Sequence, residues 1–151
     1  MKAVCEIGLI SDTHGLLRPE AIVAMEGCDV ILHAGDVGGS LMIDTLVQFA
    51  PTFAVGGNCD IEEIFPDYFT AIYGGKKLLM YHGHLPVDEQ AFEPDIVITG
   101  HSHVPLIDGD KKILRINPGS AGPKRFNLPV TVARLSISSG TSIARIITLN
   151  I

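Results

Sequence analysis

The sequence predicts an α/β fold in which two β-sheets pack together with helices outside them. In the first 55 residues, short apolar runs alternate with stretches of helical pattern, which is typical of βαβ units and a parallel sheet. In the second half, pairs of apolar runs flank short turns rich in Gly and Asp, which indicates β-hairpins. The hairpin strands could belong to the second packed sheet or form a separate small sheet, and the pattern alone leaves both open.

The elements of the first half are marked by apolar runs and by residues typical of helix boundaries. Pro19 stands near the start of one helical stretch and Gly27 at its end, while Ser40 is a candidate N-cap for the next. We expect strands at 4–10, 30–34 and 52–55, and helices at 19–27 and 40–50.

The second half contains three candidate hairpins and one further apolar run at 95–99. Gly74-Gly75, Asp108-Gly109-Asp110 and Ser139-Gly140 supply residues that favour tight turns. The expected strand pairs are 69–73 with 77–81, 104–107 with 113–116, and 130–137 with 143–149.

Composition narrows the class of protein. A chain of 151 residues predicts a single domain, 1–151, and 46% hydrophobic residues disfavour disorder. The net charge of −6 argues against a general nucleic-acid backbone binder, although a nucleotide could still be held at a local positive site. No run approaches the roughly 20 apolar residues of a membrane span.

The cysteines favour a reducing compartment. Cys5, Cys28 and Cys59 are odd in number and lack CxxC spacing, so we expect neither a disulfide framework nor a zinc knuckle. The first residues, MKAVCEIGLISD, reach an acid at Glu6, which interrupts any signal-peptide core. We therefore expect a cytoplasmic protein without a membrane partner.

Five apolar runs each end in a polar cluster rich in metal-binding residue types. In an α/β sheet, ligands bind beyond the carboxyl ends of the strands, so these clusters should meet at one edge. Glycines beside them allow sharp turns and close approach of the backbone. The candidate ligands are Asp12, His14, Asp36, Asn58, His82, His101 and His103.

These seven donors exceed the four of a closed tetrahedral site and suit two ions that share a carboxylate. Mixed imidazole and carboxylate donors favour first-row transition metals over Mg²⁺ or Ca²⁺. With two divalent ions, two aspartates and a bridging hydroxide, the formal charge of the site is about +1. Such a site favours a small anion, above all phosphate.

The ordered motifs resemble those of the calcineurin-like metallophosphoesterases, in particular the small single-domain bacterial and archaeal phosphodiesterases. The resemblance extends from residue 7 to about residue 120 and includes the stretch Asn117-Pro118-Gly119-Ser120. It implies a four-layer α/β/β/α sandwich. The motifs are D-x-H (Asp12, His14), G-D (Gly35-Asp36), G-N (Gly57-Asn58), H-G-H (His82 to His84) and G-H-x-H (Gly100 to His103).

The resemblance also implies a ligand set and a mechanism. The first metal would take Asp12, His14, Asp36 and His103, and the second Asp36, Asn58, His82 and His101. A hydroxide between the ions would attack phosphorus in line. The cofactors would be two divalent ions, with Mn²⁺ the first choice and Ni²⁺, Fe²⁺ or Zn²⁺ as alternatives. The catalytic residues would be Asp36, Asn58, Cys59, His82 and His101.

One position departs from the wider superfamily. Where the family usually has G-N-H-D or G-N-H-E, with a histidine that helps protonate the leaving group, this chain has Gly57-Asn58-Cys59-Asp60. A thiol can donate a proton but hydrogen-bonds more weakly than imidazolium, so we expect less help with basic leaving groups. Cys59 could equally be an inert wall. Asn58, Cys59 and His84 are the candidate substrate contacts.

Several residues near the predicted ligands have two possible roles. We expect His33 in the core or behind the ligands, and Asp60 to orient its loop or a residue behind the ligands. The acidic residues at 60, 62, 63 and 67 predict a solvated loop, or alternatively a gate to the site. Lys124 and Arg125 could contact substrate phosphate, although a solvated surface pair is the simpler reading.

The sequence therefore predicts a dinuclear phosphodiesterase acting on a small phosphodiester or nucleotide-like substrate, with some activity on monoesters. The alternative is a scaffold or binding module on the same fold, like the retromer subunit of this family. Another metallohydrolase class is disfavoured, because the chain has HSHVPL where metallo-β-lactamase-like enzymes have H-x-H-x-D-H. The C-terminal hairpin offers no catalytic residue types and could serve as scaffold or as a contact in a homo-oligomer.

Overall fold

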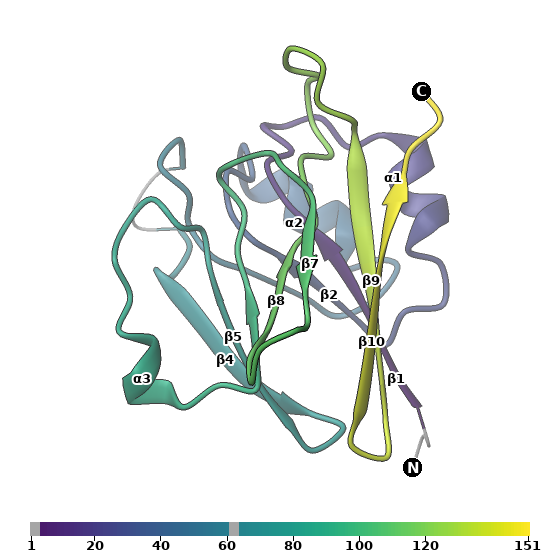
Figure 1. Ribbon diagram of the computed structural model, residues 1–151. Helices are drawn as coiled ribbons and strands as arrows, with labels where there is room; N and C mark the ends of the chain where they lie inside the picture. The colour runs from purple at the N-terminus through teal and green to yellow at the C-terminus, as the bar shows by residue number, and fades with distance from the viewer. Residues whose placement is uncertain (1–3, 61–63) are drawn as a thin grey trace.

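The computed structural model describes residues 4–60 and 64–151 and folds them into two stacked β-sheets with helices outside them (Figure 1). None of the helices described is long and apolar enough to cross a membrane. The elements are β1 Val4–Ile10, α1 Pro19–Ala24, β2 Val30–His33, α2 Ser40–Leu46, β3 Thr52–Ala54, β4 Tyr68–Tyr73, β5 Lys76–Tyr81, α3 Glu89–Phe92, β6 Ile96–Ile98, β7 Leu106–Asp108, β8 Leu114–Asn117, β9 Thr131–Ser138 and β10 Thr141–Thr148.

The first sheet has the strand order β10-β9-β1-β2-β3 and the second has the order β4-β5-β6-β8-β7. Strands β1, β2 and β3 are parallel, as the alternation of apolar runs and helices predicts. Both helices of this half are shorter than expected. Ser40 was expected as the N-cap of α2, and this is wrong: Gly39 holds the cap position at a φ of 115°, so Ser40 already lies inside the helix.

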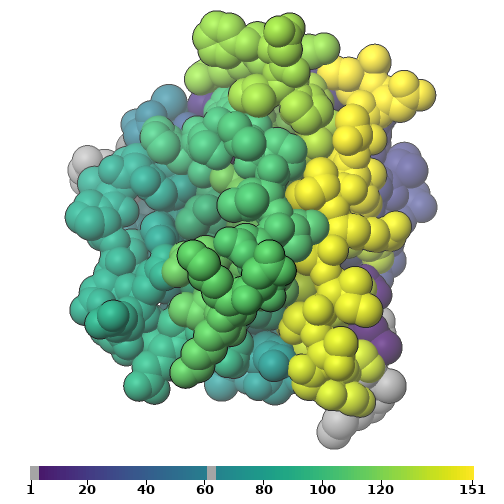
Figure 2. All heavy atoms as spheres, viewed as in Figure 1, coloured from purple at the N-terminus to yellow at the C-terminus, as the bar shows by residue number. Residues whose placement is uncertain are grey.

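All three predicted hairpins form, but they divide between the sheets. Strand β4 pairs with β5, and β7 pairs with β8, in the second sheet. The third hairpin, β9 with β10, joins the first sheet, because β9 pairs antiparallel with β1. In the space-filling view, β10 (yellow) runs along one side of the molecule beside the second sheet (Figure 2). The strands therefore form two mixed sheets, and no separate small sheet is needed for the hairpins.

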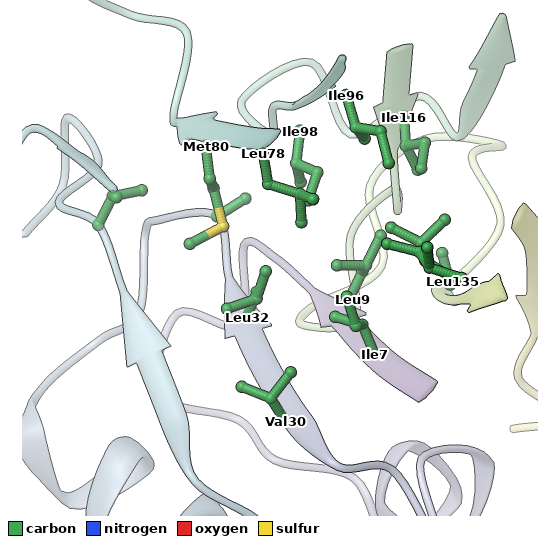
Figure 3. Packing of buried hydrophobic residues seen from close by; sticks show 14 residues of the cluster. Ile7, Leu9, Val30, Leu32, Leu78, Met80, Ile96, Ile98, Ile116 and Leu135 are labelled. Carbon is green, nitrogen blue, oxygen red and sulfur yellow. The ribbon is translucent and has the colours of Figure 1, made fainter. Parts of the chain in front are cut away.

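The two sheets pack through a shared apolar core. Ile7, Leu9 and Leu32 of the first sheet face Leu78 and Ile98 of the second, and each is fully buried (Figure 3). Burying one such side chain stabilises a protein by about 1.5–3 kcal/mol. A second cluster lies between the first sheet and helices α1 and α2. This confirms the sandwich, with the short α3 and its loops covering the outer side of the second sheet.

Helix α3 was not expected from the sequence. The Glu89 carboxylate accepts two hydrogen bonds from the Arg115 guanidinium of β8, at 3.0 and 2.6 Å, and one from the Tyr81 hydroxyl of β5. Because Arg115 and Tyr81 come from two different strands, these bonds fix the helix to the outer side of the sheet.

The loops that follow the strands contain unusual backbone. Residues other than glycine rarely adopt positive φ, and Asp and His tolerate it better than most. Eight such residues occur in the described part of the chain, and five of them are predicted metal ligands. They are Asp12 (55°), His14 (47°), Asp36 (54°), His101 (72°) and His103 (64°). Strain of about 1–3 kcal/mol per residue is therefore concentrated where the ligands are expected.

His33 joins two of these loops from inside the protein. The Gly35 N–H donates to His33 Nδ1 at 3.1 Å, so the ring proton must be on Nε2. The Thr13 hydroxyl gives its proton to the Val37 carbonyl and accepts from His33 Nε2 at 2.9 Å. Burial lowers the pKa of His33 to about 3, which keeps the ring neutral. The expectation that His33 lies in the core, behind the ligands, is confirmed.

The lowered pKa of His33 predicts a loss of stability in mild acid. The unfolded chain binds a proton at this side chain below about pH 6.5, whereas the folded chain stays neutral down to about pH 3. The unfolding free energy should therefore fall by up to about 1.4 kcal/mol per pH unit across this window. Urea unfolding with chelator at pH 6.5, 5.5 and 4.5 measures the slope. His33→Gln, which can still donate to Thr13, should flatten it, and an unchanged slope would contradict this origin.

The left-handed backbone of His101 predicts an unusual order of stability between two variants. His101→Gly and His101→Ala both remove the exposed imidazole, but only glycine adopts a φ of 72° without strain. With chelator present, the glycine variant should be more stable by about 1 kcal/mol. Ser102, which has no positive φ, provides the matched pair: there the alanine variant should be the more stable one. The same order at both positions would refute the strain.

Candidate metal centre

The five polar clusters meet at one end of the sandwich. Asp12 and His14 follow β1, Asp36 follows β2, and Asn58 follows β3, all in the first sheet. His82 follows β5, and His101 and His103 follow β6, in the second. Two hydrogen bonds join the sheets there. His82 Nδ1 donates to the Ala34 carbonyl at 2.8 Å, and the His101 N–H donates to Asp12 Oδ2 at 3.1 Å.

The first group of donors contains Asp12, His14 and His103, whose candidate ligand atoms all lie within 4.8 Å of one another. His103 Nε2 is 3.3 Å from Asp12 Oδ1, and His14 Nε2 is 3.6 Å from Asp36 Oδ2. The structure therefore brings together the four side chains expected around the first ion.

The second group is arranged around His82. Its Nε2 lies 3.1 Å from Asn58 Oδ1 and 3.3 Å from Asp36 Oδ2. His101 Nδ1 approaches Asn58 Oδ1 at 3.2 Å. Asp36 thus lies between the two groups, as expected of a shared carboxylate. Asp12 Oδ1 also reaches His82 Nε2, at 3.8 Å, so both aspartates are close to both groups, which the sequence did not indicate.

The contacts of the two His82 ring nitrogens suit a cation between these donors. A carbonyl oxygen can only accept, so the bond to Ala34 places the proton of the neutral ring on Nδ1. The lone pair of Nε2 then points at oxygens of Asn58, Asp36 and Asp12, none of which can donate a proton in its ordinary state. Lone pairs that face one another repel, and a divalent ion between them turns this repulsion into coordination.

Buried polar atoms without hydrogen-bond partners also indicate a candidate cation site. Asp12 is fully buried, yet its Oδ1 has no hydrogen-bond partner, and His14 Nε2 also has none. A buried polar group without a partner costs about 1–3 kcal/mol, and more when it is charged. The donor types and their unmet atoms therefore suit metal ions, while the number of ions and the role of each ligand stay predictions.

Each carboxylate has one oxygen held by the protein and one directed to the histidines. Asp12 Oδ2 accepts from the Ser11 hydroxyl at 2.6 Å and from the His101 N–H. Asp36 Oδ1 accepts from the Cys59 N–H at 2.8 Å. Hydrogen bonds of this kind fix the orientation of metal ligands. The sequence did not single out Ser11, whose only signal is its place directly before Asp12.

Asp60 joins two of the ligand loops. Its carboxylate accepts from the backbone N–H groups of Val37, Gly38 and Gly57, at 2.9 to 3.1 Å. The expectation that Asp60 orients its loop is confirmed. Glu62 and Glu63, expected in a solvated loop or a gate, lie outside the described residues.

The Asn117-Pro118-Gly119-Ser120 stretch is hydrogen-bonded to two of the loops that carry predicted ligands. Asn117 Nδ2 donates to the Gly100 carbonyl at 3.0 Å and to the Ser102 hydroxyl at 3.1 Å. The Ser120 hydroxyl donates to the Asp12 carbonyl at 3.2 Å. One stretch therefore positions both the Asp12 loop and the loop that carries His101 and His103.

Two motif glycines are required by close approach. A Cβ at Gly57 would collide with the Asp36 carboxylate, and one at Gly100 would collide with the Ser11 hydroxyl. The glycine of the G-N motif thus leaves room for the aspartate of the G-D motif. Close approach of the backbone thus explains why Asn58 and His101 each directly follow a glycine.

Three further residues border the donors. Cys59 is exposed, and its Sγ falls within the same 4.8 Å limit of ligand atoms on His14 and Asp36. Desolvation and the nearby Asp36 raise the pKa of the Cys59 thiol. The His84 ring packs against His82, at a centroid distance of 5.3 Å, and burial lowers its pKa. Burial also lowers the pKa of His103, opposed by Asp12 and assisted by Arg125, so Arg125 is close enough to act on this group.

The chain matches a model of the calcineurin-like phosphoesterase superfamily domain over residues 5–140. A probable metallophosphoesterase from Methanocaldococcus jannaschii is 32% identical over 146 residues, covering 87% of this chain and 75% of the relative. The solved structure of an archaeal phosphodiesterase superposes with a TM-score of 0.77 at 26% identity, covering 95% of this chain and 99% of that one.

A third similarity concerns the fold alone. Vacuolar Protein Sorting 29 from Cryptosporidium parvum superposes with a TM-score of 0.80 at 18% identity, covering 99% of this chain and all of that one. The family model covers most of the chain and includes every strand that delivers a predicted ligand. The chain therefore belongs to the calcineurin-like phosphoesterase superfamily.

Proposed function

We propose that the chain is a phosphodiesterase that depends on two divalent ions, with Mn²⁺ the first choice, and that hydrolyses small phosphodiesters. One observation carries the proposal: His82 Nε2 faces three oxygens from three separate loops, none of which can donate to it. Four imidazoles, two carboxylates and one amide oxygen form the proposed ligand set, which suits first-row transition metals. The relative named a phosphodiesterase supports the choice of diesters.

The bound ions would neutralise phosphate oxygens and lower the pKa of a water molecule that attacks phosphorus. The protein's own part is positioning. Asp36 is held by the Cys59 N–H, and Asn58 turns its amide oxygen to His82 and His101 while its Nδ2 approaches Cys59 Sγ at 3.5 Å. The Cys59 thiol, whose pKa is raised by desolvation and by Asp36, is the proposed donor of a proton to the oxygen of the leaving alcohol.

The scaffold alternative is less consistent with these contacts. A protein that used only its surfaces would gain nothing from a fully buried Asp12 oxygen without a partner, and would lose stability because of it. The likeness to Vacuolar Protein Sorting 29, at 18% identity, concerns the fold and does not decide the activity. None of the three cysteines forms a disulfide, which supports a reducing compartment such as the cytoplasm.

Replacing Asp36 should abolish both metal binding and catalysis. Asp36→Asn keeps the size of the side chain but removes the charge shared by the two donor groups. Changing a residue behind a metal ligand costs about 10- to 100-fold, so this change should lower Mn²⁺-dependent hydrolysis of bis(p-nitrophenyl) phosphate by about a hundredfold or more.

Calorimetric titration with Mn²⁺ gives an independent measure of binding at the same site. Asp44→Asn, an equal change of charge on the exposed side of α2, should leave rate and binding unchanged. Equal activity of Asp36→Asn and the parent protein, or no activity of the parent with Mn²⁺, Ni²⁺, Fe²⁺ or Zn²⁺, would refute the proposal.

The role of Cys59 predicts a dependence on the leaving group. A proton donor matters most when the leaving alcohol is basic, so Cys59→Ala should slow an alkyl diester by about tenfold or more and affect bis(p-nitrophenyl) phosphate much less. Cys59→His, which introduces a better hydrogen-bond donor, should favour the alkyl ester. The measurement is kcat/KM against the pKa of the leaving group. If log kcat/KM falls with leaving-group pKa at the same slope in the parent, Cys59→Ala and Cys59→His, Cys59 does not donate the proton and only lines the site.

A further inference from the structure

A pocket of about 600 Å³ opens directly beside the second donor group. It begins at Asn58 and His84, and His84 packs against both His82 and His101, at centroid distances of 5.3 and 6.4 Å. We name it the Phe65 pocket, and its remaining walls include Asp60, Phe65, Asp67 and Leu85.

The size and walls of the Phe65 pocket suit an organic group. Binding sites for small molecules and cofactors typically measure about 300–1,000 Å³, far more than a phosphate group needs. Phe65 and Leu85 supply apolar surface, and Gly56 and Gly57 add wall that carries no bulky side chain. A phosphodiester bound at the donors could therefore place one of its alcohol groups here.

The charge of the Phe65 pocket restricts which alcohol group fits. No Lys or Arg is present among the described residues that line it, whereas two aspartates are. The Asp60 carboxylate is occupied by three backbone N–H groups, so Asp67, which is exposed, provides the available negative charge. An anionic substituent would be repelled here, and a cation could interact with Asp67 and with the Phe65 side chain that lines the pocket.

We propose that the Phe65 pocket binds the alcohol portion of the phosphodiester, and that this alcohol has an apolar body and a positive charge, as in an alkylammonium alcohol. This inference rests on the proposed function, since it assumes that the phosphate is held at the donors. It makes Asp67 and Phe65 determinants of specificity, separate from the residues that hold metal.

A set of three esters tests the charge preference. Each is a p-nitrophenyl phosphodiester, so all three release the same leaving group. The second alcohol is choline, its uncharged isostere 3,3-dimethylbutanol, or the anionic 4-hydroxybutyrate. With Mn²⁺ present, kcat/KM should follow the order choline, dimethylbutyl, carboxypropyl. A preference for the anionic ester, or equal values for the choline and dimethylbutyl esters, would overturn the proposal.

Variants assign the preference to the pocket. Asp67→Asn should lower the ratio of kcat/KM for the choline and dimethylbutyl esters by about fivefold, near the upper limit for an exposed ion pair. Phe65→Leu, which keeps an apolar wall, should lower this ratio by about threefold through loss of the cation–π contact. Asp44→Asn is the matched control and should leave the ratio unchanged. An unchanged ratio in Asp67→Asn would refute the proposed role of Asp67 in recognising the cation.

A binding experiment separates failure of this inference from failure of the proposed function. Choline and 3,3-dimethylbutanol, neither of which carries phosphate, are titrated into chelator-treated protein and followed by amide NMR shifts. Choline should shift the signals of Phe65 and Asp67 more than the alcohol does, and Asp67→Asn should reduce the difference. Equal or absent shifts would refute the pocket assignment, whatever the hydrolysis assays give. Absence of hydrolysis together with selective shifts would refute the enzyme and keep the cation site.

Discussion

The interaction that the rest of the structure must balance is the mutual repulsion of unpaired donors at one end of the sandwich. Asp12 Oδ1 is buried without a partner, and the lone pair of His82 Nε2 points at three oxygens. Left alone, these groups would separate or recruit water, since a buried unpaired polar atom costs free energy. They stay together because the two sheets share an apolar core and because the loops between them are held from behind.

The support is built mainly from bonds to backbone. Asp60 accepts from three backbone N–H groups in two loops, and Asn117 and Ser120 donate to carbonyls of two others. Hydrogen bonds of this kind hold the backbone in strained conformations, including the positive φ angles of five predicted ligands. The backbone strain and the repulsion between donors occur at the same place, so the candidate cation site is already preorganised in the metal-free protein.

These contacts explain which parts of the molecule the sequence could predict. Strands, parallel order and the three hairpins follow from local patterns of apolar residues and turn residues, and the predicted ligands follow from their chemical types. Pairing of β9 with β1 could not be predicted, because these strands are far apart in the chain and no local signal selects the partner. The role of Ser11 and the Glu89–Arg115 contact could not be predicted for a similar reason, because each depends on a partner that is brought close only by folding.

The charge distribution connects metal binding with the choice of substrate. The protein carries a net charge of −6, and Asp12 and Asp36 make the empty ligand set negative as well. Two divalent ions would reverse the sign at the predicted ligands, whereas Asp67 in the neighbouring Phe65 pocket would keep its negative charge. A phosphate group would then be attracted at the donors, while an anionic substituent in the Phe65 pocket would be repelled by Asp67. Under the proposed function, this difference in charge between the donors and the Phe65 pocket favours a small diester whose second alcohol is cationic, as we propose for the pocket.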